Sequence, residues 1–196
     1  MLSSVYSYLL RFVDLTHEEF VQISKLMEVR HFNKKTRLVN LGENERYMNF
    51  MGTGLARKYF YRNNEEVITQ IAKEGEFICS SVSFLTGTPS EYIVETIEPS
   101  SMISISVENM EKVYELSHKM ERLGRLVIID WLIQKESWDN ARISQSPKDR
   151  FLDFVDQSPD LYSRVPQKFL ASYLNIKPET FSRYKHLLQK QANVHG

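Results

Sequence analysis

The stretch between residues 31 and 107 constrains the fold more than any other part of the chain. Short segments such as "RYMNFMGTGLARKYFYRNNEEVITQIA" and "EYIVETIEPSSMISIS" are separated by glycines, prolines and the pair Asn63-Asn64. Asparagine tolerates positive φ, so this pair is typical of a β-hairpin turn. Several short strands with regular turns predict a small antiparallel barrel or sandwich.

A long helix is predicted after these strands. Residues 118–144 contain no proline and one glycine over 27 residues, which corresponds to ~40 Å of helix at 1.5 Å per residue. Large side chains recur along it at intervals of three and four, and the small Gly124 would allow close approach. This pattern is typical of a two-fold contact between chains, and the expected dimer residues are Met120, Gly124, Val127, Trp131 and Trp138. The alternative is a helix packed on the sheets of its own chain.

The segment "VPQKFLASYLNIKPETFSRYKHLL" predicts two further helices joined by a tight turn. Leu170 and Leu174 lie one turn apart on the first helix, with the small Ala171 beside them. Asn175 can adopt the left-handed conformation that ends a helix, and Pro178 suits the first position of the next one. Two short helices that cross at a small residue form a helix-turn-helix.

The second of these helices has two chemically different faces. Phe181, Tyr184 and Leu188 fall on one side, whereas the opposite side is polar. In a major groove, arginine can pair with guanine, glutamate can accept from cytosine and serine can contact either base. Lysines beside this face can meet phosphates. The candidate DNA-binding residues are Glu179, Thr180, Ser182, Arg183, His186, Lys168, Lys177 and Lys185. The alternative is a plain helical hairpin whose polar face only meets water.

Charge supports a polyanionic partner for the end of the chain. The net charge is zero overall, but residues 162–196 hold six lysines or arginines and one acidic residue. A compact basic region is typical of nucleic-acid binding, although a solvated basic tail would have the same composition. The single cysteine, Cys79, excludes a disulfide framework and fits a reducing cytoplasm. We expect no signal peptide and no membrane span, since no long apolar run is present.

Motifs for enzyme chemistry are absent from the sequence. The five histidines are scattered, and none forms the pair or triad that a metal-binding barrel enzyme needs. No glycine-rich phosphate loop opens a helix, and no serine, histidine and aspartate form a known motif. We therefore expect no enzyme, no metal and no certain cofactor. Cys79 could be a redox thiol or simply a small buried hydrophobic residue.

The order of these parts resembles the Crp/Fnr family of bacterial transcription regulators over nearly the whole chain. "PETFSR" is similar to the E-x-x-S-R of the family's recognition helix, which carries over to Glu179, Ser182 and Arg183. "RYMNFMGTGLARKYF" resembles a hairpin of the family's barrel, and "EGEFICSSVSFLTGTPSEYIVET" resembles its phosphate-binding cassette. The partners that the resemblance implies are double-stranded DNA with an inverted repeat, a second copy of the chain and RNA polymerase.

The resemblance also implies an α+β fold in three parts. Residues 1–116 would form an antiparallel β-barrel of the jelly-roll, cyclic-nucleotide-binding type with flanking helices. Residues 117–144 would form a long dimerisation helix, and residues 145–196 an all-α helix-turn-helix domain. We expect no counterpart of the family's two-stranded wing, since the "QKQANVHG" given after the recognition helix is too short to form it.

The cassette departs from the cyclic-AMP-binding members of the family. Those members carry Gly-Glu where this chain has Cys79-Ser80, and Arg-Ser or Arg-Thr where it has Ser90-Glu91. The missing arginine would pair the cyclic phosphate, so cyclic AMP is not expected to bind. The divergent pocket for an unidentified small-molecule effector would comprise Gly75, Glu76, Cys79, Ser80, Ser81, Ser90, Glu91 and Tyr92. The second hypothesis for function is a ligand-sensing or protein-interaction module that no longer reads DNA.

Overall fold

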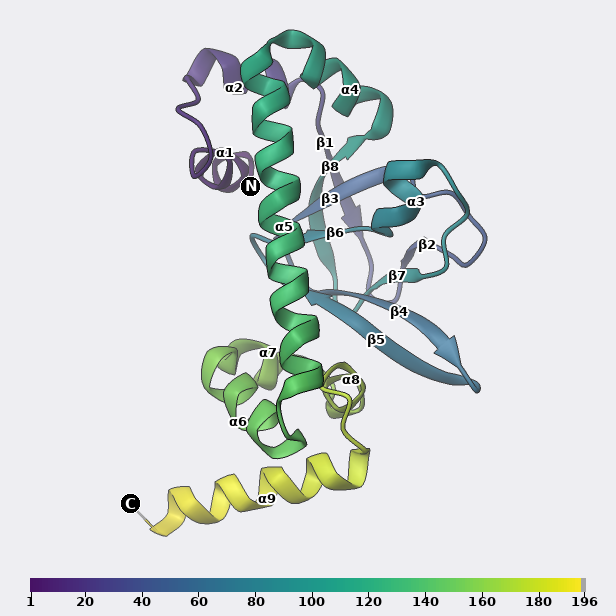
Figure 1. Cartoon of the computed structure of the whole chain (residues 1–196), viewed down its shortest axis with the longest axis vertical. Coiled ribbons are helices and arrows are strands. Elements are labelled where there is room, and N and C mark those ends of the chain that lie inside the picture. The colour runs from purple at the N-terminus through teal and green to yellow at the C-terminus, as the bar shows by residue number, and fades with distance from the viewer. Residues whose placement is uncertain (195–196) are drawn as a thin grey trace.

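The chain begins with two short helices that cover one end of the molecule. In the computed structural model, which describes residues 1–194, these are α1 (Leu2–Leu9) and α2 (His17–Ser24) (Figure 1). Thr16 and Glu19 form a reciprocal capping box at the start of α2, which satisfies backbone N–H groups of its first turn. Of Leu187 and residues 189–194 only the backbone is described.

The strands that follow form two four-stranded antiparallel sheets, in the orders β1-β8-β3-β6 and β2-β7-β4-β5. Within residues 1–194 they form two separate sheets, so the sandwich form of the prediction holds rather than a closed barrel. Asn63 and Asn64 have φ of 52° and 63° and turn β4 back into β5, as expected. The strands are β1 (Glu28–Phe32), β2 (Arg37–Val39), β3 (Tyr47–Thr53), β4 (Ala56–Arg62), β5 (Glu65–Ala72), β6 (Phe77–Ile78), β7 (Ile93–Thr96) and β8 (Ser100–Ser106).

Three further helices complete the N-terminal part and its boundary. The short α3 (Ser81–Thr86) lies between β6 and β7, and α4 (Val107–Leu116) follows β8. The long α5 spans His118–Ser144, as predicted, and Ser117 caps its first turn by accepting the Met120 N–H. No described helix is both long and apolar enough to cross a membrane.

The predicted contact seam of α5 packs inside its own chain. Met120 and Val127 are buried in a core shared with α1, α2 and α4, and Gly124 is covered by Tyr114. Trp131 packs beside a buried cluster of Met48, Cys79 and Phe84, and Trp138 stacks on Tyr173. This corrects the predicted dimer seam, and the alternative of a helix packed on its own chain describes these residues. The reason is that the N-terminal helices and the sandwich already cover the side of α5 on which they lie.

The C-terminal part consists of α6 (Pro147–Gln157), α7 (Pro159–Arg164), α8 (Gln167–Tyr173) and α9 (Pro178–Val194). Ser146 caps α6 and Pro147 opens it. Their buried residues share one core with strands β4, β5 and β7, which joins the helices to the sandwich. Because α9 continues to Val194, most of the segment "QKQANVHG", expected to follow the recognition helix, belongs to it; His195 and Gly196 lie outside the described residues.

Candidate nucleic-acid interface

The orientation of α9 is set by aromatic packing on its inner side. Phe181 is fully buried and meets Phe151 with ring centroids 5.1 Å apart and planes perpendicular. Tyr184 and Leu188 lie partly buried against the same core. Edge-to-face aromatic contacts of this kind stabilise by about 0.5–1.5 kcal/mol beyond the buried area. The helix is therefore held at a defined rotation, which decides the side chains that face solvent.

The opposite side of α9 presents the predicted reading residues to solvent. Glu179, Ser182, Arg183 and His186 are exposed, and their spacing places them on one face of the helix. Thr180 is half-buried. These are the side chains that the sequence pattern placed on the recognition face.

The predicted phosphate-contacting lysines do not all lie together. Lys177 is exposed in the turn before α9, and Lys185 is half-buried on the helix. Lys168 is exposed on α8. The pKa of Glu66 is lowered mainly by hydrogen bonds from Arg57, and the charge of Lys168 adds to this lowering. Lys168 thus lies toward the sheet side of α8, whereas Lys177 and Lys185 lie nearer the exposed face of α9.

The turn between α8 and α9 has the geometry that the sequence predicted. Asn175 adopts φ 51°, and its N–H donates to the Ser172 carbonyl at 3.0 Å. The next residue, Ile176, is buried and donates to the Ala171 carbonyl at 2.9 Å. These bonds satisfy carbonyls at the end of α8 and fix the angle at which α9 leaves it.

Arg150 stabilises this arrangement and was missed in the sequence. It is buried on α6, where its Nε donates to the Leu174 carbonyl at 2.6 Å and its Nη1 to the carbonyls of Arg142 and Gln145 at 2.9 Å each. One guanidinium therefore caps the ends of both α5 and α8, where a positive charge is favourable. The sequence signal that could have identified this role is an arginine beside Phe151 on the apolar face of an amphipathic helix.

The C-terminal helices are docked on the exposed edge of strand β5. The Ser172 hydroxyl donates to the Glu66 carbonyl at 2.7 Å and accepts the Ile68 N–H at 3.0 Å, so it takes the place of a neighbouring strand. Arg164 adds ion pairs with Glu74, at 2.8 Å, and with Glu98. The position of the helix-turn-helix relative to the sandwich is therefore set by specific polar contacts as well as by the shared core.

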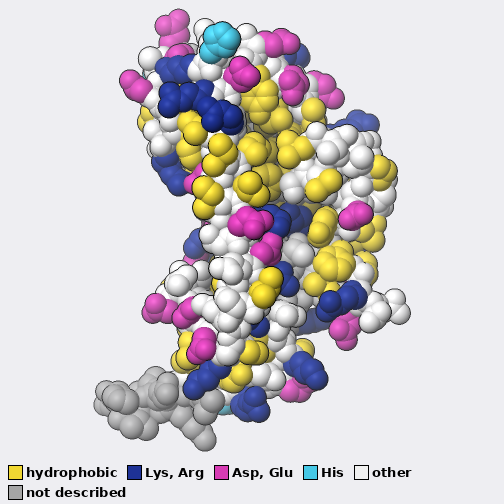
Figure 2. Space-filling model, viewed as in Figure 1, with side chains coloured by type: hydrophobic (Ala, Val, Ile, Leu, Met, Phe, Trp, Pro, Cys, Tyr) yellow, Lys and Arg dark blue, Asp and Glu magenta, His cyan; other side chains and the backbone are white. Residues whose placement is uncertain are grey.

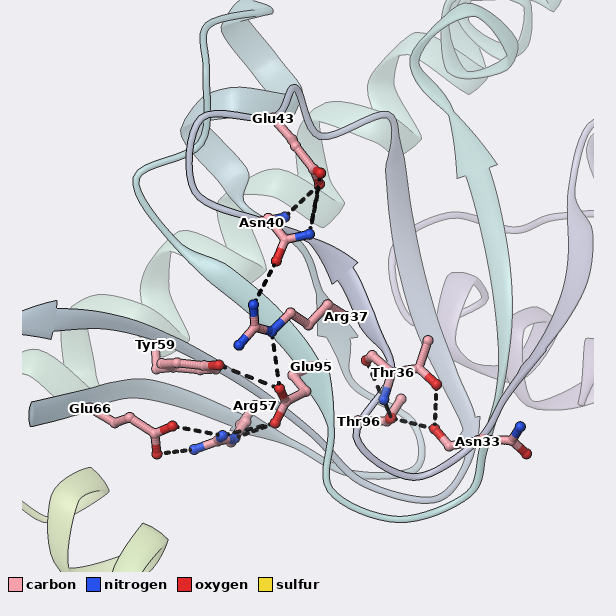
Figure 3. A network of polar contacts seen from close by, with 10 residues as sticks. All are labelled: Asn33, Thr36, Arg37, Asn40, Glu43, Arg57, Tyr59, Glu66, Glu95 and Thr96. Atoms are coloured by element: carbon pink, nitrogen blue, oxygen red, sulfur yellow. Dashed lines mark hydrogen bonds and ion pairs between the residues drawn. The ribbon is translucent and has the colours of Figure 1, made fainter.

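A buried charge network lies beneath this docking surface. The Arg57 guanidinium bridges Glu66 at 2.7 Å and Glu95 at 2.8 Å (Figure 3). The Cζ atom of the same guanidinium lies 3.9 Å from the centre of the Phe169 ring on α8. Since two carboxylates face its single positive charge, Arg57 can remain charged in the interior. The network extends through Arg37 to Asn40 near the sheet edge (Figure 3).

The predicted effector residues divide into two groups. Cys79, Ser80 and Ser90 are buried, and the Ser90 hydroxyl donates to Ser80 Oγ at 2.7 Å. The Ser80 N–H donates to the Glu45 carboxyl group at 3.1 Å, so the start of α3 already holds an acceptor from its own chain. Burial raises the pKa of the Cys79 thiol, which suits the hydrophobic interpretation of this residue better than the redox one.

The remaining predicted effector residues lie at the surface. Glu91 is exposed, whereas Gly75, Glu76, Ser81 and Tyr92 line a cleft of about 890 Å³ between the sandwich and α5. Lys58, Trp131, Lys135 and Trp138 also line this cleft and were not assigned to a pocket from the sequence. Among the described residues, no cluster of three or more histidine, cysteine or acidic side chains could hold a metal ion.

Comparison with known proteins shows similarity at the level of structure. No family model matches the sequence, and no curated protein matches it. FixK2 from Bradyrhizobium japonicum superposes with a TM-score of 0.71 at 16% identity, covering 85% of this chain and 86% of FixK2. A protein from Eubacterium rectale described as a transcriptional regulator of the Crp/Fnr family has a TM-score of 0.68 at 15% identity, covering 91% and 85%.

A third solved structure covers a smaller share of this chain. A cyclic-nucleotide-binding domain from Methylobacillus flagellatus has a TM-score of 0.65 at 15% identity, covering 72% of this chain and 82% of that one. The fold thus defines a class: a two-sheet domain of the cyclic-nucleotide-binding type followed by a long helix and a helical end. Within that class, this chain has the fold of the Crp/Fnr regulators, as the sequence predicted.

Proposed function

We propose that this chain is a transcription regulator that binds double-stranded DNA as a homodimer and reads an inverted repeat with α9. The exposed face of Glu179, Ser182, Arg183 and His186 is the observation that carries the proposal. The aromatic anchor at Phe181 holds this face outward. An arginine and a glutamate one turn apart can address guanine and cytosine in the same half-site. RNA polymerase is the partner that such a regulator would contact on DNA.

The exposed side of α5 supports a two-fold contact between copies. Ile129, Leu132, Ile133 and Ile143 are 40%, 54%, 59% and 86% exposed, and Ile129 and Ile143 are two heptads apart. Hydrophobic side chains gather where α5 crosses the face shown in Figure 2. An apolar stripe on the exposed side of a long helix is suited to pairing with a second copy. This stripe replaces the buried seam as the proposed dimer contact.

The dimer contact is tested by changing this stripe. Ile129→Glu with Leu132→Glu places charges on exposed positions, so the chain should fold but sediment as a monomer. Val127→Asp is the contrasting variant, because it buries a charge within the chain and should lower the melting temperature. A wild-type protein that is already monomeric at micromolar concentration would overturn the two-fold contact.

DNA reading is tested by selecting random duplexes with the purified wild-type protein. We expect an enriched inverted repeat with half-site centres about 34 Å apart, one helical turn. Arg183→Ala should weaken binding to the selected site by ~1–3 kcal/mol and relax the preference at one guanine per half-site. Lys185→Ala should weaken binding to all sequences alike and lower the salt slope by about one.

A matched control separates these effects from general loss of charge. Arg122 is an exposed arginine on α5, far from α9 in the chain, so Arg122→Ala should leave the guanine preference unchanged. If no repeat is enriched, and if Arg183→Ala and Lys185→Ala are both as harmless as Arg122→Ala, the face of α9 only meets water. The second hypothesis, a module that senses a ligand or binds a protein, would then be favoured.

A further inference from the structure

Lys58 is a buried cation without a matching anion. The residue lies on β4 and is 6% exposed, and its Nζ has one hydrogen-bond acceptor among the described residues, the Cys79 carbonyl at a long 3.4 Å. The neighbouring Arg57, on the opposite face of the strand, is bridged by two carboxylates. An ammonium has three donors, so Lys58 keeps hydrogen-bonding capacity that its own chain leaves unused.

The groups around Lys58 leave its charge uncompensated. Lys135 and Asp139 on α5, and Glu45 before β3, act on it at longer range, but Asp139 is paired with Lys135 and Glu45 accepts backbone N–H groups. Burial lowers the pKa of Lys58, as expected where an ammonium is desolvated without a carboxylate. Buried charges of this kind are costly and commonly belong to a site for a ligand.

Lys58 lies on the wall of the cleft between the sandwich and α5, between two aromatic rings. Its Nζ is 5.6 Å from the centre of the Tyr92 ring and 5.9 Å from that of Trp131, and all three residues line the cleft. Trp138, farther along the same helix, also lines it, and its Nε1 is buried without a hydrogen-bond partner. The cleft therefore offers the Lys58 ammonium together with flat aromatic surfaces.

We propose that this cleft binds a small aromatic carboxylate, with the carboxylate on Lys58 and the ring against Tyr92 and Trp131. A single negative charge matches the site, because the other two lysines of the cleft are engaged, Lys135 by Asp139 and Lys73 by Asp160. Glu76 on the same wall would repel a second negative charge. A ligand with a flat ring can cover both aromatic side chains, as binding sites of this kind commonly do.

The chain carries its own reporter for this site. Its two tryptophans, Trp131 and Trp138, both line the cleft. Titration of the full-length protein with benzoate should therefore change the tryptophan fluorescence and raise the melting temperature, since a ligand that binds only the folded state stabilises it. Cyclohexanecarboxylate tests whether the ring must be aromatic. Inorganic phosphate and adenosine monophosphate test whether the site prefers a carboxylate to a phosphate group. The assay contains no DNA, so its outcome does not depend on the proposed DNA reading.

Lys58→Met keeps the length of the side chain and removes its charge. It should weaken benzoate binding by at least about tenfold and raise the melting temperature without ligand, because an unmatched buried charge is gone. Lys34→Met, at an exposed lysine in the turn after β1, should change neither. Tyr92→Leu removes one ring but no tryptophan, and it should weaken benzoate more than cyclohexanecarboxylate. This second variant keeps the test decisive if Lys58→Met does not fold.

Three results would overturn the proposal. The first is no change in fluorescence or melting temperature with benzoate up to about 10 mM, a concentration that detects even weak binding. The second is equal benzoate affinity in the wild type, Lys58→Met and Tyr92→Leu. The third is tighter binding of phosphate or adenosine monophosphate than of benzoate, which would assign the cleft to phosphorylated ligands instead.

Discussion

Replacing Arg150 by methionine should loosen the whole C-terminal part of the chain. The side chain is 4% exposed and donates to three carbonyls, of which that of Leu174 is reached by a fully buried hydrogen bond and those of Arg142 and Gln145 by partly buried ones. Methionine fills much of the same volume and donates no hydrogen bond. The variant therefore isolates the guanidinium from the packing of its stem.

The magnitude follows from the three carbonyls. An unsatisfied buried acceptor costs ~1–3 kcal/mol, and the two partly buried carbonyls can recover part of their loss from water. Removing the guanidinium also relieves its desolvation, which is the main cause that lowers the pKa of Arg150. The balance is a loss of about 3 kcal/mol in the free energy of unfolding, which is a large part of the 5–15 kcal/mol typical of a domain.

Denaturant unfolding measured by tryptophan fluorescence tests this value, because Trp138 stacks on Tyr173 of α8 with ring centroids 4.3 Å apart. Hydrogen exchange should lose protection first in residues 146–188, which would show that the effect is local. Lys148→Met, at an exposed position of the same helix, is the matched control and should change stability little. A loss below about 1 kcal/mol for Arg150→Met, similar to that of the control, would refute the capping role.

Three further predictions follow from the charge environment. Hydrogen bonds from Arg164 lower the pKa of Glu74 to about 2, from an ordinary value of 4.5. The pair should therefore contribute its full stabilisation of the folded state above about pH 4.5 and lose it as the pH falls toward 2. The melting temperatures of the wild type and Glu74→Gln should then converge in acid. Calorimetry with sub-millimolar cyclic AMP should detect no binding, because Ser90 replaces the phosphate-pairing arginine; a micromolar Kd would contradict this. Cys79 should react with iodoacetamide only after unfolding, since burial raises its thiol pKa; rapid alkylation of the native protein, followed by mass spectrometry, would show the opposite.

Much of the fold could be predicted from patterns that act over a few residues. Positive φ at Asn63, Asn64 and Asn175 was expected because asparagine tolerates that region, and the structure has all three. The limits of α5 were predicted because residues 118–144 form a run without proline, and the structure ends this helix at Ser144, before Pro147 opens α6. The outward face of α9 followed from the spacing of Phe181, Tyr184 and Leu188 on its other side.

Only the tertiary structure decided which of these surfaces meet one another. The seam on α5 was correctly seen as a packing face, but its partners are Tyr114 and the N-terminal helices rather than a second copy, and nothing within a few residues of the seam specifies that choice. In the sequence, Lys58 within "ARKYFYR" cannot be distinguished from a surface lysine. In the fold it is buried, and its acceptor is the Cys79 carbonyl rather than a carboxylate. Helix limits and turn conformations depend on neighbours along the chain, whereas burial and charge pairing depend on residues brought together from distant positions, and a single sequence does not record those distances.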